Sequence, residues 1–263
     1  MNHSPTLSGT AAIQADLWGA RAADWAEHEL QYRSLYADAL DLLSLAPGAR
    51  LLDIGCGSGV CLGVASGRGA QVTGLDASPA MLDHARERAP DAQLDVGDLQ
   101  FLPYDDGAFD AVTTFNSFWF AADPVAALAE AARVVVPGGR VLMLVFGRPE
   151  RCDITPMLGA VAALGPPAAR GKFDFHERGV LERMAETAGL ATERAGSLMS
   201  SLTFADEDAL LRQLLSPGSV VMAARHSGEA AVRAAILRSL APYRGANGAY
   251  ALACEWRYLI ASA

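Results

Sequence analysis

The sequence contains few cysteines and no excess of basic residues. Its 263 residues include four cysteines, none of which forms a C-x-x-C pair or lies at ligand spacing from a histidine. We therefore expect free thiols in a reducing compartment and no metal site. The formal net charge is −9 and the pI is about 5.0, whereas a nucleic-acid-binding face is normally basic. The composition thus argues against a broad nucleic-acid interface.

Targeting and membrane-spanning patterns are also missing. The first twenty residues, MNHSPTLSGTAAIQADLWGA, show no basic stretch followed by an apolar one, so no signal peptide is expected. No apolar run approaches the roughly 20 residues that a membrane-spanning helix needs. The sequence also shows no internal repeat and no low-complexity tract. These absences lead us to expect a soluble, cytoplasmic protein.

From residue 48 to about residue 147, short apolar runs alternate with stretches of helical pattern. Such alternation is typical of βαβ units and of a parallel sheet covered by helices on both faces. We therefore predict an α/β fold. The predicted strands are Arg50–Ile54, Gln71–Leu75, Ala92–Val96, Phe109–Thr114 and Arg140–Phe146, and the predicted helices are Ser58–Ser66, Pro79–Arg88 and Pro124–Val134.

Helical patterns flank this region on both sides. Apolar residues recur at spacings of three and four over residues 7–46, and again over residues 205–241 with an interruption at SPGS. Between them we predict a helix Glu177–Ala188 and a strand Ala191–Leu198. The even positions from Tyr250 to Ile260 are apolar or aromatic, which is typical of a strand. A last strand reached through a long helical insertion predicts a cap over one end of the sheet.

Three glycines follow the first predicted strand. Gly55, Gly57 and Gly59 allow a sharp turn with positive φ, and they leave main-chain N–H groups bare at the carboxyl edge of the sheet, where such folds bind ligands. From Gly55 the sequence reads G-C-G-S-G-V, so the third glycine comes one position too early for a dinucleotide site. A ligand with an amino acid and a nucleoside but no phosphate, such as S-adenosylmethionine (SAM), fits better. A plain turn that packs a helix on a strand is the alternative.

An acidic residue ends the second predicted strand. Asp76 lies 19 residues after Gly57, and a carboxylate there can accept hydrogen bonds from both hydroxyls of a ribose. Its alternative role is to cap the next helix, but Ser78, just before Pro79, is better placed for that. Met81 follows one turn later and either covers an adenine ring or belongs to the core.

Polar residues follow the third and fourth predicted strands as well. Asp98, beside Leu99, either accepts a hydrogen bond from an adenine amine or is merely solvated. Asn116 lies at the tip of the fourth strand, where polar groups converge on the cleft. Four aromatic residues surround it, of which some belong to the core and others line an apolar substrate pocket; they are Phe115, Phe118, Trp119 and Phe120.

Four stretches in order resemble the class I SAM-dependent methyltransferases, and most closely their small-molecule group that includes ubiquinone- and menaquinone-methylating enzymes. They are LLDIGCGSG, VTGLDASPAML, DVGDLQFLPYDDGAFDAV and EAARVVVPGGRVLMLVF. The resemblance covers roughly residues 48–147. It implies a Rossmann-like seven-stranded sheet of order 3-2-1-4-5-7-6 with an antiparallel last strand. It also implies an N-terminal helical lid over residues 1–46 and a SAM-binding domain over 47–263, with cap insertions at about 148–175 and 205–241.

The resemblance further implies a set of cofactor-binding residues. Gly55 and Gly57 would approach the methionine part of SAM, with Asp53 holding the same end partly through water, and the backbone at Asn116 would meet the amino group. The ribose would bind at Asp76 and the following Ala77, and the adenine at Asp98 and Leu99 beside Met81. In the lid, Trp18 or Trp25 either shields the cofactor or belongs to the core.

Methyl transfer from a sulfonium sulfur is an in-line displacement, so alignment and exclusion of water carry much of the rate. A base is needed only when the acceptor must lose a proton. His176 and His226 are the candidates, although a histidine in such a position is more often solvated or a helix cap than catalytic. No N-P-P-Y or N-P-P-F follows the fourth strand, which argues against the DNA-amine and glutamine acceptors of many enzymes that carry that motif.

Three functions remain open from the sequence. The first is a SAM-dependent methyltransferase for a small, fairly apolar metabolite, suggested by the aromatic cluster and the cap insertions. The second is a protein or RNA methyltransferase, and the third is a SAM-binding cyclase or binding module that transfers no methyl group. The acceptor, its reacting atom and the oligomeric state are not specified by any pattern in the sequence.

Overall fold

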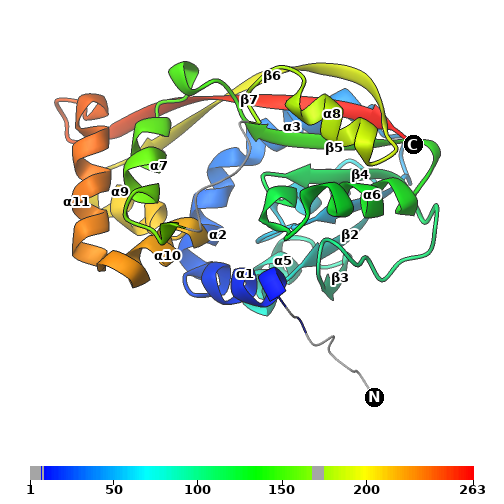
Figure 1. The fold of residues 1–263 in the computed structure, drawn as a ribbon, viewed down its shortest axis with the longest axis horizontal. Coiled ribbons are helices and arrows are strands. Elements are labelled where there is room, and N and C mark those ends of the chain that lie inside the picture. The colour runs from blue at the N-terminus through cyan, green and yellow to red at the C-terminus, as the bar shows by residue number, and fades with distance from the viewer. Residues whose placement is uncertain (1–6, 8, 168–174) are drawn as a thin grey trace.

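The computed structural model of the chain describes residues 7, 9–167 and 175–263. Within these residues, seven strands form one sheet in the order β3-β2-β1-β4-β5-β7-β6 (Figure 1). Pairing is parallel from β3 to β5 and antiparallel where β7 meets β5 and β6. The predicted order and the antiparallel last strand are confirmed. The strands are β1 (Arg50–Ile54), β2 (Gln71–Asp76), β3 (Gln93–Val96), β4 (Phe109–Phe115), β5 (Val135–Phe146), β6 (Ala191–Phe204) and β7 (Tyr250–Ser262).

Helices cover both faces of this sheet, and each face has its own apolar core. One face carries α3 (Arg33–Leu43), α4 (Val60–Ser66) and α5 (Pro79–Arg88), and the other carries α6 (Pro124–Val134) and α8 (Val180–Thr187). The first core includes Leu51 and Leu82, and the second includes Leu52 and Leu128. Neighbours such as Leu51 and Leu52 belong to opposite cores because successive strand side chains point to opposite faces.

Local capping explains why two helices have the predicted bounds. Before α5, the Ser78 side chain accepts a hydrogen bond from the Met81 N–H, and Pro79 is the first helical residue. Before α6, Asp123 accepts from the N–H groups of Val125 and Ala126. A side-chain oxygen at the N-cap satisfies a donor that the first turn leaves free, so Ser78 is confirmed as the cap of α5.

Some predicted bounds were wrong, and the conformation of single residues explains most of the differences. Helix α4 begins at Val60 rather than residue 58, because Gly59 before it has a left-handed φ of +81°. Gly179 delays the start of α8 to Val180 in the same way. Strand β5 begins at Val135 rather than residue 140, since Val135 already pairs with Phe109 of β4.

The two long strands β6 and β7 extend beyond the rest of the sheet (Figure 1) and hold a group of helices that we call the cap, namely α7 (Thr155–Ala162), α9 (Glu207–Leu214), α10 (Gly218–Ser227) and α11 (Glu229–Leu240). The segment Trp256–Ser262 of β7 pairs with β5, whereas the outer part of β7 pairs with β6 and has isolated bridges to Cys152 and Arg244. Strand β6 therefore runs on to Phe204, six residues beyond the predicted end. Helices α9, α10 and α11 connect the outer ends, and α7 packs against α10 and α11 (Figure 1). Residues 168–174, the last part of the first predicted cap insertion, lie outside the described residues.

The N-terminal helices α1 (Gly9–Gly19) and α2 (Ala22–Glu29) lie between this cap and the sheet domain (Figure 1). Helix α1 packs against α10 and α5, and α2 packs against α9 and α5. Three ion pairs join residues 16–27 to the cap: Arg225 with Asp16, Arg212 with Glu27 at 2.7 Å, and Arg21 with Glu229 at 2.7 Å. No described helix is long and apolar enough to cross a bilayer.

Two glycines with nearly the same φ allow a test of packing at the glycine loop. Gly59 has a φ of +81°, and a Cβ there would lie 2.7 Å from Ala85 Cα, whereas Gly138 has a φ of +77° and open space around it. Gly138→Ala should cost about 1–2 kcal/mol from backbone strain alone. Gly59→Ala should cost a further roughly 1–3 kcal/mol from overpacking against α5. Urea denaturation of both variants measures the difference, and equal losses would contradict the close approach of α4 and α5.

Candidate active site

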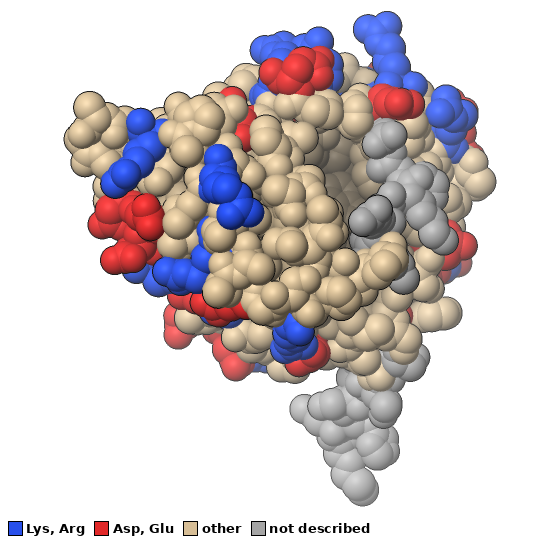
Figure 2. Space-filling view, turned by 60° about the vertical axis from the view of Figure 1, so that its left-hand side comes forward, with Lys and Arg blue, Asp and Glu red and all other residues tan. Residues whose placement is uncertain are grey.

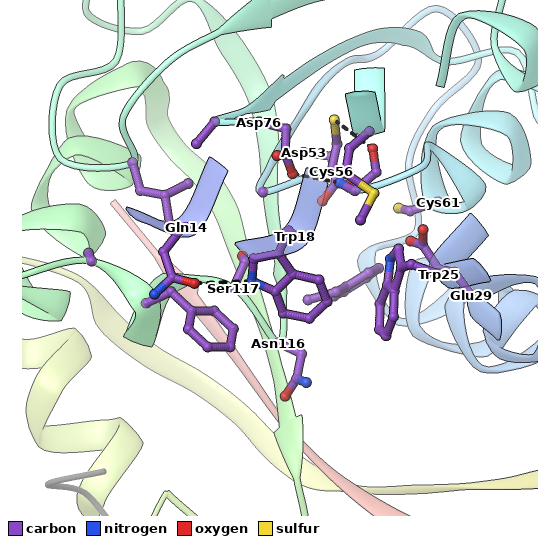
Figure 3. A pocket seen from close by; sticks show the side chains of 18 of the residues that line it. Gln14, Trp18, Trp25, Glu29, Asp53, Cys56, Cys61, Asp76, Asn116 and Ser117 are labelled. Atoms are coloured by element: carbon purple, nitrogen blue, oxygen red, sulfur yellow. Dashed lines mark hydrogen bonds between the residues drawn. The ribbon is translucent and has the colours of Figure 1, made fainter. Parts of the chain in front are cut away.

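A cavity opens at the carboxyl ends of β1, β2 and β4 and is closed by the N-terminal helices (Figure 3). Every residue predicted to bind the cofactor lies in its lining. These residues are Trp18, Asp53, Gly55, Gly57, Asp76, Ala77, Met81, Asp98, Leu99 and Asn116. The structure therefore brings together residues from five separate segments of the sequence.

The glycine loop presents main chain without side chains toward this cavity, but the expectation of free N–H groups was wrong, because those of Gly55 and Gly57 are hydrogen-bonded within the protein. Gly55 and Gly57 have φ values of +72° and +54°, a conformation that residues with a side chain rarely adopt. The N–H of Gly55 donates to the Leu75 carbonyl at 2.7 Å, which fixes the loop on β2. A Cβ on Gly55 would overlap the side chain of Ser117, so glycine is required by both φ and space.

Asp76 joins the ends of β1 and β2. One carboxylate oxygen accepts the Gly57 N–H at 2.9 Å, and the other accepts the Ser78 N–H at 2.8 Å. Burial raises the pKa of Asp76, and these backbone donors oppose that change. The carboxylate is thus held rigidly at the cavity wall.

Glu29, at the end of α2, is a site residue that the sequence patterns did not reveal. It is 4% exposed, and its carboxylate accepts hydrogen bonds from the Ser58 N–H at 2.9 Å and from the Ser58 hydroxyl. Arg88 donates to the carbonyl of Ser58 at 2.9 Å and to that of Ala26 at 2.6 Å. Burial raises the pKa of Glu29. The sequence did contain one indication of this role, namely a set of residues spaced three or four apart that all line the cavity: Trp25, Glu29, Tyr32 and Tyr36.

Asp53 lies at the base of the cavity and is 2% exposed. Its carboxylate accepts a hydrogen bond from the Thr113 hydroxyl at 2.7 Å. Burial raises the pKa of Asp53 to about 7, and the charges of Glu29 and Asp76 add to the effect. Three carboxyl groups that are costly to ionise therefore face one cavity.

Aromatic side chains form the rest of the wall. Trp18 and Trp25 of the N-terminal helices meet edge to face with ring centroids 4.8 Å apart (Figure 3). Tyr36 stacks on Phe115 at 4.9 Å. Trp256 of β7, which also lines the cavity, is fixed by a hydrogen bond from its indole N–H to the Ser200 hydroxyl at 2.8 Å. The cavity thus has a polar end at the glycine loop and an apolar remainder.

Asn116 stands in an uncommon backbone conformation at the tip of β4. Its φ is +57°, and its N–H is already bonded to the Leu144 carbonyl at 2.8 Å. Its side-chain oxygen Oδ1 is buried without a hydrogen-bond partner in the described part of the chain. A buried acceptor left free at a cavity wall suits a ligand that brings a donor.

The comparison with known families identifies the domain. A family described as a methyltransferase domain matches residues 52–143, from β1 to β5. This part of the chain is a methyltransferase domain. Together with the sheet order 3-2-1-4-5-7-6, this match confirms the resemblance and the Rossmann-like fold.

Relatives and solved structures agree with this assignment. A ubiquinone biosynthesis O-methyltransferase from Alkalilimnicola ehrlichii is 34% identical over 150 residues, covering 54% of this chain and 61% of that protein. The chain spans only 36 to 61% of the length of four curated relatives that are 34 to 41% identical to it.

Two solved structures share the fold at low identity. Phosphoethanolamine N-methyltransferase 2 of Haemonchus contortus, in complex with phosphomonomethylethanolamine and S-adenosylhomocysteine, has a TM-score of 0.62 at 17% identity, covering 98% of this chain and 61% of that chain. The [4+2]-cyclase SpnF has a TM-score of 0.54 at 22% identity, covering 86% and 80%. At these identities the likeness concerns the fold alone.

Neither candidate base of this methyltransferase domain lies among the cavity residues. The Nδ1 atom of His226 lies 3.2 Å from the Leu164 carbonyl at an exposed position of α10. His176 lies before α8, where its carbonyl accepts a hydrogen bond from Arg257 at 3.4 Å. No group of three or more His, Cys, Asp or Glu residues in the described ranges could hold a metal ion.

Because the pKa of Asp53 is raised, we predict that its contribution to the free energy of unfolding decreases as the pH rises. The folded carboxyl, with a pKa of about 7, keeps its proton at pH values where the unfolded one has ionised. Its stabilising contribution is therefore present below the unfolded pKa and is lost as the pH rises through 7. Asp53→Asn removes this dependence. The free energy of unfolding of the wild type relative to the variant should fall on the order of 2–3 kcal/mol between about pH 5 and about pH 8.

Urea denaturation at the two pH values measures this difference. Asp110→Asn is the control, because Arg50 lowers the pKa of Asp110 and the contribution of that carboxylate is lost only as the pH falls. An Asp53→Asn difference that does not change between the two pH values would contradict the account of the buried carboxyl.

Proposed function

We propose that the chain is a SAM-dependent methyltransferase that acts on a small, fairly apolar acceptor. One observation carries the proposal: a single cavity combines a bare glycine loop and the Asp76 carboxylate with a wall of aromatic side chains. The polar end suits the amino acid and ribose of the cofactor. The apolar end suits an acceptor that is held away from water.

The residues of the polar end fit the cofactor. Asp76 would accept hydrogen bonds from the ribose hydroxyls, beside Ala77, and Asp98 with Leu99 would meet the adenine next to Met81. The backbone at Gly55 and Gly57 would leave room for the amino acid part, and the free oxygen of Asn116 would accept from its ammonium group. When bound, SAM supplies a methyl group on a positively charged sulfur.

The carboxyl groups of Glu29, Asp53 and Asp76 would also favour a cation over a neutral molecule. A positive ligand stabilises their ionised forms, and a ligand without that charge does not. We therefore expect the cavity to hold SAM more tightly than S-adenosylhomocysteine, which eases release of the product.

The acceptor would lie against Tyr32, Tyr36, Phe115 and Trp256, beneath the N-terminal helices and the cap. These residues exclude water and hold a flat, apolar molecule in place. Because neither His176 nor His226 lines the cavity, we assign the rate enhancement mainly to alignment of the acceptor and exclusion of water.

Two alternatives are less well supported. On the face drawn in Figure 2, acidic and basic side chains are interspersed around a largely uncharged hollow, whereas an RNA acceptor would need a basic groove. The [4+2]-cyclase SpnF has a similar fold, but the family that matches residues 52–143 is one of methyltransferases.

Incubation with methyl-labelled SAM separates these functions. We expect label in a small organic product when small-molecule extracts are supplied, and none in tRNA or protein. Label in tRNA or protein would contradict the small-molecule acceptor. Tight SAM binding without label in any acceptor would favour the cyclase or binding module.

The ribose role of Asp76 gives a binding prediction. Asp76→Ala removes a carboxylate that would accept charge-assisted hydrogen bonds, each worth about 1.5–3 kcal/mol. SAM affinity should fall roughly 10- to 150-fold, measured by titration calorimetry.

Asp123→Ala is the matched control, because Asp123 also accepts two backbone N–H groups but lies outside the cavity lining. This variant should lose about 1 kcal/mol of stability and keep its SAM affinity. Unchanged affinity in Asp76→Ala would refute the ribose contact.

A further inference from the structure

Tyr32 lines the cavity, and its hydroxyl is in hydrogen-bonding contact with a buried histidine, His28. Tyr32 ends the short 3-10 helix Leu30–Tyr32 and is 3% exposed. Its hydroxyl lies 3.1 Å from Nε2 of His28, and its ring meets Trp256 edge to face at 5.3 Å. No other described residue forms a hydrogen bond with the Tyr32 oxygen.

A series of contacts that begins in the cap determines which ring nitrogen of His28 carries the proton. Arg212 lowers the pKa of Glu27, so this carboxylate stays ionised and can only accept hydrogen bonds. The amide nitrogen Nε2 of Gln213 donates to it at 3.0 Å. The other end of the amide, Oε1, therefore faces Nδ1 of His28 at 3.4 Å and also accepts from Gln31 at 2.6 Å.

The amide oxygen facing Nδ1 can only accept, so Nδ1 of His28 carries the ring proton. Burial lowers the pKa of His28 to about 4, which leaves the ring neutral with a single proton. The Nε2 atom then has a lone pair and accepts the Tyr32 O–H. Once its own proton is engaged, the Tyr32 oxygen can offer only lone pairs to a ligand.

We propose that Tyr32, oriented by His28 and Gln213, selects an acceptor that presents an O–H or N–H donor on an aromatic ring. The donor meets the Tyr32 oxygen, and the ring lies against Trp256 and the stacked pair Tyr36 and Phe115. This inference rests on the proposed function, because it takes the apolar end of the cavity as the acceptor site. Tyr32 touches the acceptor, whereas His28 and Gln213 are positioning residues.

The contact also distinguishes acceptor from product. A hydroxyl that has gained a methyl group has no proton to donate, so it loses the hydrogen bond to Tyr32. It cannot recover a bond in the opposite direction, since the Tyr32 proton is directed to His28. An O-methylated product is therefore held less tightly than the hydroxyl compound from which it forms.

A matched pair of probes tests this selection by binding alone. The full chain is first loaded with S-adenosylhomocysteine and then titrated with 2-naphthol and with 2-methoxynaphthalene, which differ only in the methyl group. Wild type should bind the naphthol about 3- to 10-fold more tightly, the equivalent of one hydrogen bond. Tyr32→Phe should abolish the preference.

Tyr36→Phe is the control, because Tyr36 lines the same cavity but its hydroxyl has no hydrogen bond to a histidine among the described residues. It should keep the preference for the naphthol. A wild type without preference, or a preference that survives in Tyr32→Phe, overturns the inference. Failure of S-adenosylhomocysteine to bind in the first step would instead overturn the proposed function.

Nitrogen NMR of the wild-type chain supplies a second readout that does not depend on a variant's folding. We expect His28 to be protonated at Nδ1 alone, with the Nε2 signal of a hydrogen-bonded lone pair. Gln213→Leu should allow both tautomers. A wild-type His28 protonated at Nε2 would overturn the inference, because the Tyr32 hydroxyl would then be free to donate.

Discussion

The shape of the cavity depends on the hydrogen bonds between Glu29 and Ser58. A carboxylate removed from water is costly unless donors satisfy its oxygens, and the donors here are the N–H and hydroxyl of the residue between two glycines of the loop. Since Arg88 bonds the carbonyls of both Ser58 and Ala26, helix α2, the glycine loop and α5 are held as one unit. The N-terminal helices therefore complete the cofactor cavity, and side chains of α2 reach both its polar and its aromatic part.

The central fold could be predicted because each of its elements is specified locally. The N-cap residues Ser78 and Asp123 determine where two helices begin, and the apolar run before Gly55 forms the first strand. The cavity lining could be predicted for the same reason: parallel strands end at one edge, so Asp53, Asp76 and Asn116 converge wherever the strand order is fixed. That order came from the family resemblance and not from the residues alone.

The rest of the site depends on contacts between distant segments, which no local pattern encodes. In the sequence, Glu29 looks like an ordinary charged residue of a helix. Its burial results from contact with Ser58, which is distant in the sequence. No local pattern distinguishes His28, since its role depends on Gln213 and Tyr32, which only the folded structure brings to its ring. The two predicted candidate bases, His176 and His226, do not line the cavity. Trp256 was recognised as a strand residue, but its place in the cavity depends on how far β7 extends beyond β5.

A crystal structure with S-adenosylhomocysteine tests the central claim most directly. The account predicts ribose hydroxyls within hydrogen-bonding distance of the Asp76 carboxylate and the amino acid part beside Gly55 and Gly57, with Glu29 still bonded to Ser58. The account would be contradicted by a ligand bound at another place, or by a bound state in which the N-terminal helices have withdrawn and Glu29 no longer meets the loop.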